Sequence, residues 1–171
     1  MAATSRAWQC SCGHEIYFRN SECLGCGAPL GYLASRGALL ALQPGPRKDT
    51  WQLRGSSSRA PVYRRCANFP SPPGCNWLVE AGARGQRTRL CQACALNQCV
   101  PDLSRAGELV LWTRMERAKR RLVSQLIGLG LPVVSKVRDD PARGLAFDFP
   151  SPSPGRPRVM TGHGNGVITI K

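Results

Sequence analysis

The pattern of apolar and polar residues predicts one long helix in the back part of the chain. From Asp102 onward, apolar residues recur at intervals of three or four, the spacing of one face of an α-helix. We expect this stripe to pack on a sheet, and glycines and a proline at 128–132 to end the helix. The stripe consists of Leu111, Met115, Ala118, Leu122, Leu126 and Leu129.

Short apolar runs on both sides of the helix predict strands. In front of it, residues 16–18 and 77–79 read as strands, and 38–42 with 50–53 read as a hairpin around a Pro-Gly turn. Behind it, the predicted strands are 131–134, 145–149, 158–161 and 167–170, with a turn at 162–166. Because the last strand is apolar, we expect the sheet to have an unfinished edge.

Eight of the nine cysteines form two sets whose spacing suits zinc. A C-x-C followed by a C-x-x-C is typical of a zinc ribbon, in which four thiolates hold one structural ion. The second set ends in another C-x-x-C, but prolines between its first two members indicate a stiff loop rather than a tight turn. The predicted ligands are Cys10, Cys12, Cys23 and Cys26 for the first ion, and Cys66, Cys75, Cys91 and Cys94 for the second.

These features predict an α+β protein with four regions. Residues 1–33 form a zinc ribbon, 34–62 a hairpin and linker, and 63–100 a second zinc-binding module. Residues 101–171 form a long amphipathic helix packed on a short, incomplete sheet. A module as small as the first ribbon buries too little apolar surface to be stable alone, and the two zinc ions are expected to be structural.

The chain is basic, with a formal net charge of +14. Each zinc with four thiolates carries about −2, so two filled sites leave a charge of about +10. One helix face is rich in arginine, which makes a nucleic-acid backbone an alternative, less favoured partner. The arginines concerned are Arg114, Arg117, Arg120 and Arg121.

The N-terminal residues resemble no secretory signal, and no apolar run is long enough to span a membrane. We therefore expect a cytoplasmic protein without a membrane partner, in which paired cysteines bind metal rather than form disulfides.

Several residues allow functional interpretations other than structural zinc binding. Cys91 and Cys94 could form a redox pair, and the leftover Cys99 could replace a ligand of the second ion. His163 lies in a predicted glycine-rich turn. Asp139 and Asp140 precede a proline, which favours a polar loop over a catalytic carboxylate pair.

The motifs taken together resemble bacterial zinc-binding metallopeptidases that carry an N-terminal zinc ribbon. The resemblance runs in order through almost the whole chain, from C-S-C-G at the first cysteine pair to T-G-H and G-V-I-T-I near the end. The matching stretches are 10–13, 23–27, 30–31, 65–68, 75–79, 90–97, 101–103, 111–112, 144–149, 161–163 and 166–170.

The resemblance implies a family of enzymes in which an H-E-x-x-H helix holds a catalytic zinc. This sequence contains no such motif. Its two histidines are His14 and His163, and Phe18 stands where a second histidine would follow His14-Glu15. The chain therefore resembles the front portion of the family, as a truncated product, a fragment or a member that has lost hydrolysis.

We accordingly predict a structural zinc-binding protein without hydrolytic activity of its own. Its ribbons would position a peptidase core or another protein partner, which would dock on the unfinished sheet edge. The alternative is a basic zinc-ribbon protein that binds nucleic acid.

Overall fold

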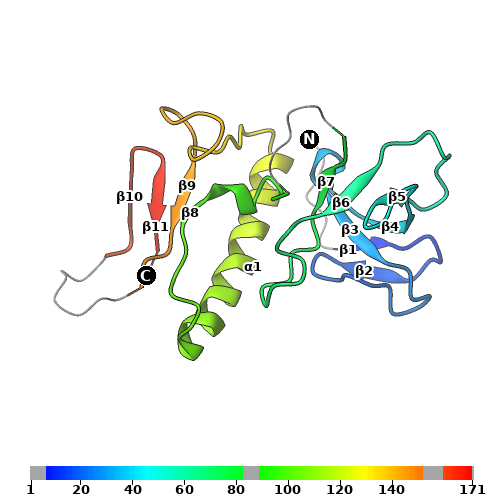
Figure 1. Cartoon of the computed structure of the whole chain (residues 1–171), viewed down its shortest axis with the longest axis horizontal. Helices are drawn as coiled ribbons and strands as arrows, with labels where there is room; N and C mark the ends of the chain where they lie inside the picture. The colour runs from blue at the N-terminus through cyan, green and yellow to red at the C-terminus, as the bar shows by residue number, and fades with distance from the viewer. Residues whose placement is uncertain (1–6, 83–88, 152–159, 171) are drawn as a thin grey trace. The chain divides into compact units, whose positions relative to one another are not determined.

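The computed structural model of the chain describes residues 7–82, 89–151 and 160–170. Short strands and, among these residues, one long α-helix form two compact units, residues 1–91 and 92–171 (Figure 1). The predicted α+β class is confirmed.

The first unit begins with a two-stranded ribbon. Strand β1 (Ala7–Gln9) pairs antiparallel with β2 (Glu15–Tyr17), and the first cysteine pair occupies the turn between them. The strand predicted at 16–18 is thus confirmed, one residue earlier. Two backbone hydrogen bonds close this turn, from Cys10 N to His14 O at 2.9 Å and from Gly13 N to Cys10 O at 2.8 Å.

A five-stranded antiparallel meander makes up the rest of this unit. Its strands lie side by side in chain order, so each pairs with the next. They are β3 (Leu30–Leu33), β4 (Ala38–Pro44), β5 (Trp51–Leu53), β6 (Tyr63–Arg65) and β7 (Leu78–Glu80), and a 3-10 turn (Ala34–Arg36) joins the first two. The pairing of β4 with β5 confirms the predicted hairpin, and β7 confirms the strand predicted at 77–79 with a shift of one residue.

Aromatic rings join the ribbon to the meander. The ring centroids of Tyr32 and Trp77 are 4.7 Å apart, those of Phe18 and Tyr32 are 4.9 Å apart, and all three side chains are buried. The side-chain amide of Asn76 donates hydrogen bonds to Phe18 O at 2.8 Å and to Asn20 O at 2.9 Å. Ring packing and a satisfied buried amide therefore hold the strand that follows the first cysteine turn.

The second unit places one helix beside a four-stranded sheet. Its elements are a 3-10 turn (Cys94–Leu96), β8 (Asn97–Cys99), α1 (Ala106–Gly128), β9 (Ala146–Asp148), β10 (Gly162–Gly164) and β11 (Val167–Thr169). The strand order is β10-β11-β9-β8, with β9 parallel to both of its neighbours and β10 antiparallel to β11. The strand β11 is therefore internal, and among the described residues the sheet ends at β10 on one side and at β8 on the other.

Two of the predicted strands behind the helix are confirmed as β9 and β11, and two predictions need correction. Residues 131–134 form no strand, and only an isolated bridge joins Ser135 to Leu145. Residues 162–164 form β10 rather than a turn, because the chain reverses later, where Asn165 and Gly166 adopt positive φ. Residues 158 and 159 of the remaining predicted strand lie outside the described residues, and 160 and 161 are not in a strand.

The helix packs on the sheet through a face that its apolar periodicity does not predict. Trp112 and Val123 are buried on this face together with Glu116, Lys119, Arg120 and Ser124. The predicted stripe points away from the sheet, with Leu111 60 % exposed, Leu122 41 % and Leu129 64 %. Trp112 stacks edge-on against Phe149 with ring centroids 5.0 Å apart. The helix therefore contacts the sheet through aromatic rings and the buried ion pair of Glu116 and Lys119, not through a row of leucines.

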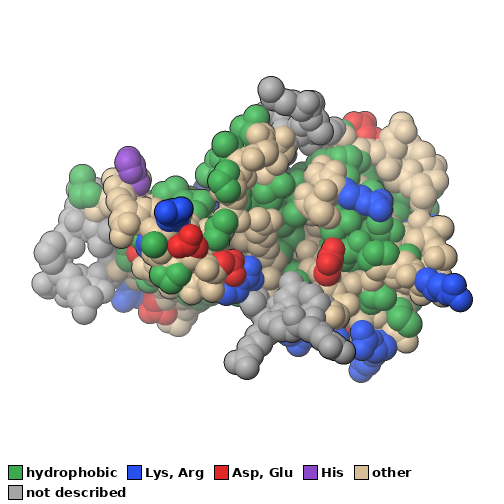
Figure 2. Space-filling model, turned by 90° about the horizontal axis from the view of Figure 1, so that it is seen from above, with side chains coloured by type: hydrophobic (Ala, Val, Ile, Leu, Met, Phe, Trp, Pro, Cys, Tyr) green, Lys and Arg blue, Asp and Glu red, His purple; other side chains and the backbone are tan. Residues whose placement is uncertain are grey.

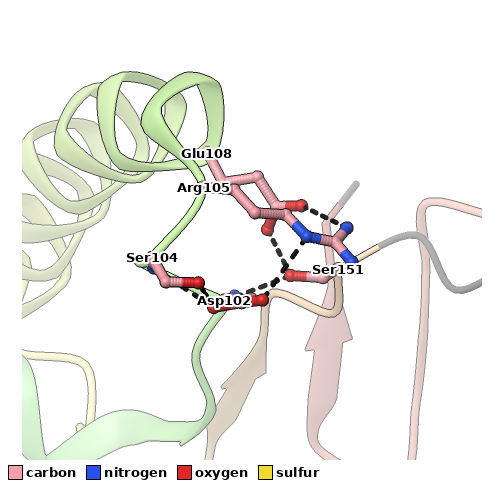
Figure 3. A network of polar contacts seen from close by, with 5 residues as sticks. All are labelled: Asp102, Ser104, Arg105, Glu108 and Ser151. Carbon is pink, nitrogen blue, oxygen red and sulfur yellow. Dashed lines mark hydrogen bonds and ion pairs between the residues drawn. The ribbon is translucent and has the colours of Figure 1, made fainter.

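A polar network fixes the start of the helix (Figure 3). The carboxylate of Asp102 accepts hydrogen bonds from the hydroxyl of Ser104 at 2.6 Å and from its N–H at 3.1 Å, and these bonds lower the pKa of Asp102. Arg105 pairs with Glu108 at 3.2 Å, and Ser151 accepts the Asp102 N–H at 2.6 Å while its hydroxyl donates to Glu108. The N-cap residue of the helix is Arg105.

The backbone of residues 136 and 140 passes so close to Gly144 that a side chain would not fit there. A Cβ atom at this position would lie 2.4 Å from Lys136 Cα and 2.5 Å from Asp140 O, and backbone cannot turn aside as a flexible side chain can. We expect Gly144→Ala to lower the free energy of unfolding by about 1–3 kcal/mol or more. Gly107→Ala, which meets no atom within 4 Å on the helix, is the control and should be neutral or stabilising by up to about 1 kcal/mol. Thermal unfolding of both variants checks this, and equal melting temperatures would contradict it.

Candidate metal centres

The first four predicted ligands lie together in the structure. Cys10 and Cys12 lie in the turn after β1, and Cys23 and Cys26 lie in a second turn. Two hydrogen bonds close this second turn, from Gly27 N to Cys23 O at 2.8 Å and from Cys23 N to Ala28 O at 2.9 Å. Their sulfur atoms all lie within 4.8 Å of one another. Cys10 Sγ is 3.8 Å from Cys26 Sγ, and Cys12 Sγ is 3.7 Å from Cys23 Sγ.

The second four predicted ligands also lie together. Cys66 follows β6, Cys75 comes before β7, and Cys91 and Cys94 share a tight turn. All four are buried, their sulfurs lie within 4.8 Å of one another, and the Cys75 and Cys91 sulfurs are 3.6 Å apart. The N–H of Cys91 donates to Cys66 Sγ at 3.3 Å, a bond that favours the thiolate.

The sulfur spacing matches the requirement of zinc. Zinc–thiolate bonds are about 2.3 Å long, so the edges of a tetrahedral four-sulfur cage are about 3.8 Å. The measured separations of 3.6, 3.7 and 3.8 Å are close to this value and far longer than a disulfide bond. The two groups therefore fit two structural zinc ions. Four thiolates fill the tetrahedron and leave no open position for substrate or water.

The thiols of the first group differ in their acidity. Burial opposes ionisation of Cys10, but hydrogen bonds from the Cys12 backbone and from neighbouring thiols outweigh it and lower the pKa to about 7. At Cys12 a bond from the His14 backbone favours the thiolate, but contacts with the Cys26 and Cys23 thiols and partial desolvation raise the pKa to about 11. Metal must displace the remaining protons, so zinc affinity is expected to fall in acid.

The other candidate residues lie outside these groups. Cys99 is in β8, and its sulfur donates to Val100 O at 3.7 Å. His163 lies exposed on the edge strand β10. Asp139 pairs with Arg138 at 2.7 Å, which lowers its pKa, and Asp140 accepts the N–H groups of Ala142 and Arg143. The two aspartates therefore fasten a loop, as the sequence predicts. The redox alternative for Cys91 and Cys94 needs only two thiols, whereas here four converge.

Sequence reasoning missed two buried residues next to the second group. Glu116 and Lys119 belong to α1, and one carboxylate oxygen of Glu116 lies 3.9 Å from Cys94 Sγ. Charged residues within a basic helix look like a solvated face, so the sequence does not mark this pair as buried. The i, i+3 spacing of Glu116 and Lys119 is the one available hint, because it permits an intrahelical ion pair.

Loss of a single ligand should remove a single ion. We expect the unaltered chain to hold two zinc equivalents, and Cys23→Ser and Cys75→Ser each to hold one, because a three-sulfur site binds much more weakly. Cys99→Ser is the control and should keep both. Metal analysis after gel filtration measures this; two equivalents in either ligand variant would contradict the assignment.

Proteins of two mycobacteria are similar to this chain. Uncharacterized proteins of Mycobacterium bovis and of two strains of Mycobacterium tuberculosis are 38 % identical to it over 160 residues, which is 94 % of this chain. The match covers 40 % of each of these proteins, so this chain spans less than half of their length. No solved structure is significantly similar.

Two family models cover nearly the whole chain. A zinc-ribbon domain model matches residues 7–105, which include all eight cysteines of the two groups. A model described as "Putative zinc-binding metallo-peptidase" matches residues 108–171, from the first turn of α1 onward. The resemblance seen in the sequence is thereby confirmed, and the protein binds zinc and resembles part of a metallopeptidase. The chain belongs to the zinc-ribbon family, and its ribbon is followed by a zinc-binding metallopeptidase-type segment.

Proposed function

We propose that these 171 residues act as a zinc-stabilised scaffold for a peptidase core and do not hydrolyse peptides themselves. The observation that carries this proposal is the closure of both metal groups by four cysteines, because a hydrolytic zinc needs an open position for water. The sequence adds support, since an H-E-x-x-H motif is absent from it.

The proposed partner is a polypeptide like the part of the mycobacterial proteins that this chain does not match. That part is about 60 % of their length, given the 40 % that is matched. The exposed leucines of α1 support this choice, because an apolar stripe of several helical turns is costly to leave in water. No other described strand lies on the outer side of β10, so this edge can pair with the same partner, and beside it is an apolar hollow lined by Leu145, Val167 and Ile168.

We further propose a cytoplasmic location, since eight metal-binding thiols require a reducing compartment. No helix within the described part of the chain has the length and apolar character needed to cross a membrane.

Nucleic acid is the less favoured partner. Arg114 and Arg117 are exposed, but Arg120 is only 4 % exposed and cannot reach a phosphate backbone. Figure 2 shows Lys and Arg side chains scattered over the visible face rather than gathered in one patch. A backbone-binding surface normally concentrates its positive charge.

One pair of helix variants separates the two kinds of partner. The binding protein is the unmatched part of a mycobacterial relative, and binding is measured by titration calorimetry. We expect the triple change Leu111→Gln, Leu122→Gln, Leu129→Gln to weaken binding at least about tenfold, because each leucine loses apolar contact. Arg114→Gln with Arg117→Gln, on the same helix, should leave binding unchanged.

The nucleic-acid alternative predicts the reverse order. Duplex DNA or RNA would then bind in a gel shift with a steep salt dependence, and the arginine variant would lose that binding while the leucine variant kept it. Circular dichroism of both variants should match the parent, since exposed substitutions change stability by about 0.5 kcal/mol or less. No binding of the relative's segment, or equal binding by all variants, would contradict the scaffold proposal.

Absence of hydrolysis is tested directly. With two zinc equivalents bound, the chain should release no more product from casein or from a fluorogenic peptide library than buffer does. A chelator-sensitive rate that co-purifies with the chain and disappears in Cys75→Ser would overturn this part of the proposal.

A further inference from the structure

A buried polar network connects the helix to the sheet in the second unit. Glu116 is 1 % exposed and Lys119 is 3 % exposed, although both carry charge. Lys119 Nζ lies 2.5 Å from Glu116 Oε1, and the amide of Asn97, from β8, donates to the same oxygen at 3.0 Å. Lys119 also donates to the amide oxygen of Asn97. The three side chains therefore close a ring of hydrogen bonds.

Two aromatic rings border these hydrogen-bonded side chains. Lys119 Nζ lies 5.8 Å from the ring centre of Phe147 and 5.9 Å from that of Phe149. Removing two charges from water is unfavourable, and well-packed apolar residues often serve stability equally well in such a place. The burial of this pair therefore calls for a role beyond filling the space under α1.

The second oxygen of Glu116 points to that role. Its Oε2 lies 3.9 Å from the sulfur of Cys94, a member of the second cysteine group. Cys94 begins the 3-10 turn that leads directly into β8, where Asn97 lies three residues further on. Glu116, Lys119 and Asn97 thus link the metal-ligating residue Cys94 to the helix and to the sheet. Metal ligands are commonly oriented by such outer partners.

The charges fix what each member of the pair must do. Zinc with four thiolates is an anionic group, and a lone carboxylate 3.9 Å from one of its sulfurs would repel it. The ammonium of Lys119 offsets that carboxylate, so the pair as a whole adds no net charge beside the sulfur. Lys119 therefore removes the repulsion that Glu116 alone would exert on the zinc-bound sulfur of Cys94.

We propose that Glu116 and Lys119 are the outer partners of the second cysteine group and make the folding of α1 depend on the metal held there. This inference rests on zinc binding by that group. Glu116 and Lys119 are positioning residues, because they act on the metal through Cys94. The first cysteine group has no part in the network and serves as an internal reference.

The charge argument makes an unequal prediction for three variants. Zinc affinity of the full chain is measured by competition with a chromophoric chelator, which resolves two binding steps. Lys119→Met leaves Glu116 unbalanced and should weaken one step at least about tenfold while the other stays unchanged. Glu116→Gln removes the repelling charge and should stay within about threefold of the parent. The double variant should follow Glu116→Gln, and Arg117→Gln, exposed on the same helix, should change neither step.

The dependence of α1 on the metal has its own readout. Hydrogen exchange of residues 106–128 is measured in Cys75→Ser, which keeps the contact of Glu116 with Cys94 but loses the second ion, and in Cys23→Ser, which loses the first. We expect protection of the helix to collapse in the former and persist in the latter.

Three outcomes overturn the inference. They are unchanged zinc steps in Lys119→Met, equal weakening by both single variants, and a helix that stays protected in Cys75→Ser. Each differs from failure of zinc binding itself, which would appear as fewer than two equivalents in the unaltered chain.

Discussion

Bonds between cysteine sulfur and zinc are the interaction on which this protein depends. All but two of the strands in the described residues are three residues long, and a three-residue strand contributes few backbone hydrogen bonds and little buried apolar area. Structural zinc contributes about 10–16 kcal/mol in small peptides, which exceeds the net stability of many whole domains. Two such ions can therefore hold turns that would otherwise stay open, and the aromatic cluster of Phe18, Tyr32 and Trp77 can pack on the turns they fix.

The second unit combines this constraint with a buried ion pair. A continuous set of contacts runs from the metal-ligating residue Cys94 to α1 and to β8, through Glu116, Lys119 and Asn97. The helix in turn exposes leucines that its own sheet does not cover. One face of α1, with Glu116 and Lys119, contacts the sheet. The other face carries exposed leucines that could contact another protein. Such a division suits a scaffold whose partner is supplied by another polypeptide segment.

Local chemistry explains what the sequence could and could not predict. Cysteine spacing reports directly on ligand geometry, and both four-sulfur groups are where the spacing places them. The hairpin and the helix follow from patterns within a few residues. The buried face of α1 does not, because periodicity finds an apolar stripe without knowing whether a sheet covers it, and Leu122 is exposed while Lys119 is buried. The strand at 162–164 was missed because a Gly-His-Gly segment has no strand propensity, and its pairing with β11 decides the conformation.

The most direct test of this account is X-ray absorption at the zinc edge of the purified, fully loaded chain. Its fine structure reports the number and kind of atoms bound to the metal, averaged over both ions. The account predicts four sulfur neighbours per zinc at about 2.3 Å and no nitrogen or oxygen shell. A shell of nitrogen or oxygen at about 2.0–2.1 Å, or a sulfur count clearly below four, would show that a histidine, a carboxylate or water completes at least one centre and would contradict it.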